Sequence, residues 1–181
     1  TELDFAGSIV ESAQHMIVHS EFTASKLLSF QPDCQVQVIP HHLTPTGDTF
    51  KAEFKDDYRE ILSLPKNKPI FTSLGFIAEA KQISEVLNVC GNLKLAGIDF
   101  LYVLAGSAKA NEYDIFWEIE SRGLTDYVTV TGYLSEDDFF RHLHAADFIV
   151  NLRYPSGGET SGTFVRAMGA GKCCVIINEG P

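Results

Sequence analysis

The sequence predicts an α/β fold, a Rossmann-like parallel sheet with helices on both faces. Short apolar runs alternate with helical patterns about every 20–30 residues, which is the spacing of βαβ units. One run, residues 100–105, is almost entirely apolar, as expected for a strand that is buried on both faces. The chain has 181 residues and is 45% hydrophobic, which suffices for one well-buried domain and hardly for two. We therefore expect residues 1–181 to form a single domain.

The predicted strands are short apolar runs that end at turn residues or at helix starts. They comprise residues 15–20, 35–39, 69–74, 100–105, 127–131, 147–151 and 173–177. In a parallel sheet, ligands bind beyond the carboxyl ends of the strands, where the strand order reverses. The loops to inspect are therefore residues 75–81, 106–111, 132–135 and 154–163.

The predicted helices lie between these strands. They comprise residues 21–30, 53–64 and 110–121, and helices that begin after Lys81, at Ser135 and at Thr160 or Ser161. After Lys81, apolar residues recur at i, i+3, i+4 and i+7 from Ile83, so one face of this helix lies on the core. Ser20 is the expected cap of the first helix, and Ser135 with Asp138 resembles a capping box.

Composition excludes several classes of partner. The net charge of −10 argues against a nucleic-acid partner, because phosphate backbones need clustered Lys and Arg. It leaves room for a small anionic ligand, which needs only one or two cations and some N–H groups. The spacing of the four cysteines (Cys34, Cys90, Cys173 and Cys174) and six histidines is typical of neither a disulfide nor a metal site. We expect reduced, buried thiols in a cytoplasmic protein.

Targeting and boundary signals are scarce in the chain. No run reaches the apolar length of a membrane span, and the first residues resemble no signal peptide. The chain lacks an initiator Met and stops shortly after a predicted strand. We expect it to be part of a longer two-domain protein, with residues 1–20 near the interdomain junction.

Residues 155–172 carry the most specific pattern, a small-residue loop with one acidic residue before a helix. The first turn of a helix presents unpaired N–H groups and the positive end of the dipole, which suit a phosphate or pyrophosphate. Gly162 in that turn has a conformational cost that makes sense where backbone approaches a ligand closely. A carboxylate at Glu159 would suit sugar or ribose hydroxyls. Its other interpretation is a charge that only stabilises the helix start.

The remaining candidates are weaker one by one. Gly75 lets the chain turn tightly, and Lys81 could reach a phosphate as a point charge, although a solvated surface lysine is the simpler interpretation of Lys81 alone. Gly106 is a common residue for a turn between strand and helix. Residues 132–134 could border a flat ring or form an ordinary helix start. Arg166, one turn into the last helix, could pair with Glu159 or with a phosphate, or form a surface ion pair.

Several segments, in this order, resemble the C-terminal, donor-binding domain of a retaining GT-B glycosyltransferase of the group 1 (family 4) type. They are residues 18–23, 38–41, 75–81, 103–106, 130–135, 146–150 and 155–176. The resemblance covers nearly the whole chain. It implies a UDP- or GDP-sugar as donor, with no metal or other cofactor. It also implies a glycan or lipid-linked acceptor that is bound by a separate N-terminal domain, and leaves room for peripheral membrane association of the full-length protein.

The resemblance also implies roles for individual residues. Lys81 would contact the diphosphate, and the loop with Tyr133 and Leu134 would border the base. The N–H groups of the helix start would hold the diphosphate, and Glu159 would face the donor sugar as the catalytic residue. The implied donor site contains Gly75, Lys81, Gly106, Tyr133, Leu134, Glu159, Thr160, Ser161, Gly162, Thr163 and Arg166.

Two residue-level departures from the family pattern bear on these roles. No Arg lies between Gly75 and Lys81, and Arg166 stands where the family has a second glutamate, one residue closer to Glu159 than usual. The carboxylate that grips the ribose is then absent or replaced, and Arg166 would serve the phosphates or hold Glu159. The leading hypothesis is a glycosyltransferase whose isolated domain binds nucleotide and turns over poorly. The alternatives are a non-catalytic nucleotide-sugar sensor or adaptor of the same fold, and an unrelated doubly wound nucleotide-binding domain.

Overall fold

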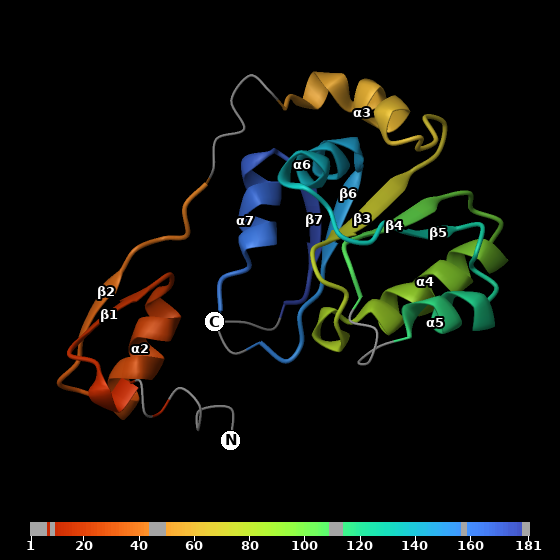
Figure 1. Ribbon diagram of the computed structural model, residues 1–181. Coiled ribbons are helices and arrows are strands. Elements are labelled where there is room, and N and C mark those ends of the chain that lie inside the picture. Colours follow the sequence, from red (N-terminus) through yellow and green to blue (C-terminus); the bar gives the residue numbers. More distant parts are fainter. Residues whose placement is uncertain (1–6, 8–9, 44–49, 109–113, 157–158, 179–181) are drawn as a thin grey trace.

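The computed structural model describes residues 7, 10–43, 50–108, 114–156 and 159–178. Its main body is a five-stranded parallel sheet with helices on both faces (Figure 1), which confirms the predicted fold class. In spatial order the strands are β5 (Val128–Val130), β4 (Leu101–Ala105), β3 (Ile70–Leu74), β6 (Phe148–Asn151) and β7 (Cys173–Ile176).

The strand order reverses between β3 and β6. From β3 the chain adds β4 and β5 on one side, and β6 and β7 follow on the other. All five residues of β4 are buried, as the apolar run at 100–105 predicted. Asp147, directly before β6, accepts hydrogen bonds from Ile70 N and from Arg59, both at 2.7 Å. These bonds fix β6 against β3, so the reversal lies at a rigid point of the sheet.

Two apolar clusters fill the two faces of the sheet. On one face, α4 (Ile83–Leu95) and α5 (Ile115–Ser121) bury their apolar stripes against Tyr102, Leu104 and Val128. On the other face, α6 (Glu136–Ala145) and α7 (Gly162–Gly169) pack on Ile70, Val103 and Ile149. The short helices η1 (Ala52–Phe54) and α3 (Lys55–Ile61) replace the predicted helix 53–64, and α3 packs beside α6 (Figure 1).

Side-chain caps set several helix starts. Ser20 caps α2 (Glu21–Phe30), and Ser135 caps α6 by accepting the N–H of Asp138 at 3.1 Å, as predicted. Asp114 accepts the N–H of Trp117 at 3.0 Å and so starts α5 at Ile115. Residues 110–113 of the predicted helix 110–121 lie outside the described residues.

β1 (His15–Val18) and β2 (Gln35–Val38) form a separate two-stranded parallel sheet with α2 (Figure 1). We expected these strands in the same sheet as the others, and that expectation is wrong. Polar residues at 35 and 37 alternate with valines in β2, and Ile17 of β1 is 65% exposed. Such strands lack the two apolar faces that an inner strand of a parallel sheet needs.

The cysteines are free thiols, but they are not all buried. Cys34 and Cys90 are buried as predicted, whereas Cys173 is exposed and Cys174 is partly exposed. The reason is that β7 lies at the edge of the sheet, where Val175 and Ile176 are exposed as well. Within the described part of the chain, no helix is both long enough and apolar enough to cross a bilayer.

Candidate functional site

A cavity of about 370 Å³ lies beyond the carboxyl ends of β3 and β6, where the strand order reverses. The described residues that line it are His41, Gly75, Phe76, Lys81, Asn151, Leu152, Arg153, Ser161, Gly162, Thr163 and Arg166. Three of them are Lys or Arg, and none of these described lining residues is Asp or Glu. In a chain with a net charge of −10, such a wall attracts an anionic ligand.

Gly75 and Gly106 bring the loops after β3 and β4 into direct contact. Gly75 has a φ of +84°, which favours glycine, and its N–H donates to Ala105 O at 2.9 Å. A β-carbon on Gly106 would lie 2.1 Å from Gly75 O, so only glycine fits there. Of these two predicted site residues, Gly75 lines the cavity, and Gly106 shapes the loop behind it.

Lys81 is not a solvated surface lysine. It ends the short helix η2 (Glu79–Lys81), and its Nζ donates to Leu74 O, at the end of β3, at 2.6 Å. A β-carbon on Gly75 would lie 3.2 Å from this Nζ, which places the ammonium against the backbone of Gly75. Burial, together with the positive charge of Arg153, lowers the pKa of Lys81 to about 8. The ammonium is therefore poorly hydrated and close to a second cation.

Ser161, rather than Thr160, is the N-cap of α7. Its Oγ accepts the N–H of Phe164 at 3.3 Å and donates to Asn151 Oδ1 at 3.3 Å. The N–H groups of Gly162 and Thr163, in the first turn, have no partner within the helix. Because both residues line the cavity, the positive end of α7 faces it.

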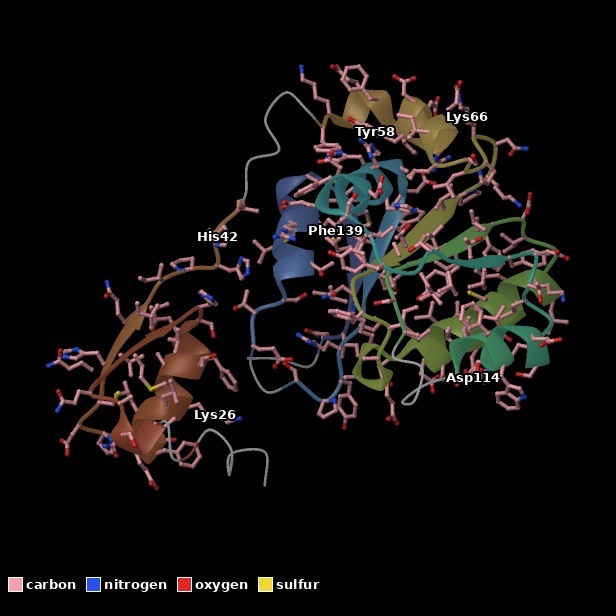
Figure 2. The ribbon with its side chains drawn as sticks, in the orientation of Figure 1. Lys26, His42, Tyr58, Lys66, Asp114 and Phe139 are labelled. Atoms are coloured by element: carbon pink, nitrogen blue, oxygen red, sulfur yellow. The ribbon has the colours of Figure 1, made fainter. Side chains whose placement is uncertain are left out.

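Residues 41–43, which follow β2, lie alongside α7. A β-carbon on Gly162 would lie 3.0 Å from His41 Nε2, and one on Gly169 would lie 2.5 Å from a methyl carbon of Leu43. His42, labelled in Figure 2, marks this segment between β2 and α7. His41 thereby lines the cavity beside the start of α7.

Arg166 and Glu159 do not lie as their spacing in the sequence suggested. The ion-pair partner of Glu159 is Arg153, with 3.2 Å between Nη1 and Oε1. Arg166 instead places its guanidinium over the rings of Phe139 and Phe140, 5.4 and 5.9 Å from their centroids. Phe139 is labelled in Figure 2 beside α6 and α7. The stacked guanidinium of Arg166 lines the cavity and is available to an anion.

Residues 54–181 match the family Glycosyl transferases group 1. The chain belongs to this family. The matched range includes the five-stranded sheet and, of the described residues that line the cavity, all except His41. No curated protein matches the chain significantly.

Several solved structures share the fold of this group 1 domain. Sucrose-phosphate synthase from Thermosynechococcus elongatus superimposes with a TM-score of 0.71 at 23% identity, over 96% of this chain and 43% of that one. WaaG, a glycosyltransferase involved in lipopolysaccharide biosynthesis, superimposes with a TM-score of 0.72 at 16% identity, over 91% of this chain and 44% of that one. HepE from Anabaena, solved with UDP and glucose, superimposes with a TM-score of 0.73 at 17% identity, over 93% of this chain and 45% of that one. The chain thus spans less than half the length of these proteins.

A second, smaller cavity of about 110 Å³ adjoins the first in the group 1 domain. The two share Gly75 and Phe76, and the smaller one is also lined by Gly106, Tyr133 and Leu134. Tyr133 is 83% exposed, whereas Leu134 packs against the buried core. The predicted site residues of the glycine loops therefore line two adjoining cavities.

Not every predicted site residue of this domain lines a cavity. Glu159 and Thr160 line neither of the two. Residues 109–111 and 157–158 of the predicted loops lie outside the described residues. Arg153 lines the cavity but is absent from the predicted site, because the predicted loop after β6 begins at residue 154. The signal that would have found it is its position two residues beyond the end of a parallel strand. In the described part of the chain, no group of three or more His, Cys, Asp or Glu is placed to hold a metal ion.

Proposed function

We propose that this chain is the donor-binding domain of a glycosyltransferase and holds a nucleoside diphosphate sugar in the cavity beyond β3 and β6. The observation that carries the proposal is the set of cations Lys81, Arg153 and Arg166 around one cavity at the start of α7. A diphosphate is the part of such a donor that cations and helix N–H groups recognise. The HepE structures, which contain UDP or UDP-glucose, support this choice of ligand.

The two adjoining cavities suggest how the donor lies. The diphosphate occupies the larger cavity, against Lys81 and the N–H groups of Gly162 and Thr163. The base extends into the smaller cavity, where Tyr133 and Leu134 border it. The donor sugar then points towards Glu159 on the far side of the larger cavity.

The chemical step is transfer of the sugar to an acceptor with retention of configuration. The bond between the anomeric carbon and the diphosphate oxygen breaks, an acceptor hydroxyl oxygen bonds to that carbon on the same face, and the hydroxyl proton passes to the departing diphosphate, on which negative charge develops. The cavity stabilises that charge through Lys81, Arg166 and the first turn of α7, which are in place before the reaction. In this proposal these groups serve the diphosphate without a metal ion. The acceptor, a glycan or a lipid-linked glycan, is bound by another domain, and this domain alone turns over poorly.

A non-catalytic nucleotide-sugar sensor is the second candidate. It is favoured by Arg166, a cation stacked on two aromatic rings at the position where the resemblance leads us to expect a carboxylate for the ribose. A sensor needs to bind the donor but has no need to activate it. Both candidates place the protein in the cytoplasm, and the transferase is compatible with peripheral attachment to the membrane.

Transfer by the full-length protein tests the proposal. The protein is incubated with UDP- and GDP-sugars and glycan or lipid-linked acceptors, and the anomeric configuration of the product is determined by NMR. We expect retention, and loss of about 100-fold or more in kcat for Lys81→Ala. Lys66→Ala is the matched control, because Lys66 pairs with Glu60 at the exposed end of α3 (Figure 2). Donor binding without transfer would favour the sensor, and inversion would contradict the proposed mechanism.

A further inference from the structure

The backbone next to Arg153 is tied to the backbone next to Lys81. The neighbouring residue, Tyr154, donates its N–H to Ala80 O at 2.9 Å, and Gln82 Nε2 donates to Tyr154 O at 3.1 Å. These two bonds tie the chain after β6 to the residues on either side of Lys81. The side chain of Arg153 therefore starts beside Lys81, although 72 positions separate the two residues in the sequence.

The charges of Arg153 and Lys81 act on each other across the cavity. Both side chains line it, and the positive charge of Arg153 contributes to the lowered pKa of Lys81. Two like charges that line one cavity repel each other, and an anion bound between them removes the repulsion. A diphosphate offers one phosphoryl group to each cation.

The ion pair of Arg153 with Glu159 leaves the guanidinium available. The Nη1–Oε1 distance is 3.2 Å, and the two side chains are 42% and 44% exposed. Exposed ion pairs of this kind are weak, so a phosphate can replace the carboxylate at little expense in free energy. The planar guanidinium can then donate two parallel hydrogen bonds to phosphate oxygens, which an ammonium cannot do.

We propose that Arg153 is a diphosphate-binding residue of this cavity and acts with Lys81 on the same ligand. It supplies, from the loop after β6, the guanidinium that is missing between Gly75 and Lys81. Glu159 orients this guanidinium while the cavity is free. The inference rests on the proposed function, because it takes a nucleoside diphosphate as the ligand.

Calorimetric titration of the chain with UDP, GDP, ADP and inorganic pyrophosphate tests the inference. For the probe that the unmodified chain binds most tightly, Arg153→Ala is expected to weaken binding about tenfold or more. Arg153→Lys keeps the charge and loses the planar fork. Its affinity is expected to lie between those of the unmodified chain and Arg153→Ala. The matched control is Arg122→Ala at the C-cap of α5. This change breaks a pair with Glu118 of 2.6 Å, away from the cavity, and is expected to leave binding unchanged.

The salt dependence of binding adds a readout that a purely structural role would not move. Because salt screens the attraction between a guanidinium and the phosphates, loss of that charge makes the affinity depend less steeply on salt concentration. We expect a smaller slope for Arg153→Ala than for Arg122→Ala, and a slope for Arg153→Lys that stays close to that of the unmodified chain. Unchanged affinity and slope in both Arg153 variants, with weaker binding by Lys81→Ala, would overturn this inference and leave the proposed function standing. Absence of binding by the unmodified chain to all four probes would overturn both.

Discussion

The α-carbon of Gly106 packs so closely against Gly75 that a β-carbon on it would lie 2.1 Å from the carbonyl oxygen of Gly75. This contact joins the loops after β3 and β4 at the wall between the two cavities. Gly75 also contacts Lys81, since a β-carbon on Gly75 would lie 3.2 Å from Nζ. The fit of two backbone loops thus determines where the cationic side of the cavity lies.

Substitution of Gly106 is expected to damage both stability and the site. In Gly106→Ala the added methyl group forces the loops apart, and we expect a loss of about 1–3 kcal/mol in the free energy of unfolding. Urea denaturation measures it, and nucleotide titration measures the accompanying loss of affinity. Gly91→Ala in α4 is the matched control, because no atom lies within 4 Å of the added β-carbon. A Gly106→Ala variant as stable as the Gly91→Ala variant would contradict the close contact.

The affinity for a nucleoside diphosphate is expected to fall as the pH rises above about 8, which is the lowered pKa of Lys81. The bound anion favours the protonated lysine and raises its pKa in the complex, so binding takes up a proton once the free lysine has lost its own. A phosphate completes its ionisation near pH 6, well below this range. Calorimetry between about pH 7 and 9.5 measures the profile.

The same profile in Arg153→Ala provides the control. Removal of the neighbouring positive charge raises the pKa of Lys81, so the fall in affinity is expected to begin at a higher pH than in the unmodified chain. In Lys81→Ala the dependence on pH above about 8 is expected to vanish. An unmodified chain whose affinity stays constant over this range would show that Lys81 does not contact the ligand.

Glu159→Gln is expected to separate the sugar from the nucleotide. The amide accepts hydrogen bonds from sugar hydroxyls less strongly than the carboxylate does. The affinity for the nucleotide-sugar is therefore expected to fall about fivefold or more. Affinity for the bare nucleoside diphosphate is expected to hold or rise, because Arg153 loses its competing partner at 3.2 Å. Parallel titrations with UDP and UDP-glucose, or with GDP and a GDP-sugar, measure the difference. Equal losses for the conjugate and the nucleotide would count against the role of Glu159 at the sugar.

Arg166 is expected to contribute through both its charge and its stacking. Arg166→Ala removes a cation from the cavity and exposes the rings of Phe139 and Phe140, so we expect weaker nucleotide binding and a lower Tm. Arg166→Lys restores the charge without the planar stack and is expected to recover binding more than stability. Thermal melts and titrations of both variants distinguish these contributions. Full affinity in Arg166→Ala would remove Arg166 from the site.

Local patterns in the sequence predicted most of the fold. The apolar run at 100–105 became the fully buried β4, and Ser135 and Ser161 cap the helices that they precede. That β1 and β2 pair only with each other, outside the five-stranded sheet, was not predictable from the number of strands. It depends on which faces are apolar, and the polar residues Gln35 and Gln37 were the available sign.

The site was predictable in its loops but not in its contacts. Lys81 and the start of α7 were located from glycines and strand ends, and the structure brings them into one cavity. The pairing of Glu159 with Arg153 rather than Arg166 depends on how the loop after β6 folds back, which no local spacing encodes. The burial of Lys81 likewise comes from its bond to the carbonyl of Leu74 in another element.

Calorimetric titration of this chain with UDP, GDP and ADP in the presence of EDTA tests the central claim most directly. We predict saturable binding of at least one of them at a single site, retained without divalent metal and weakened in Lys81→Ala but not in Lys66→Ala. Absence of binding for all three nucleotides, or binding that Lys81→Ala leaves unchanged, would contradict a donor site in the cavity beyond β3 and β6.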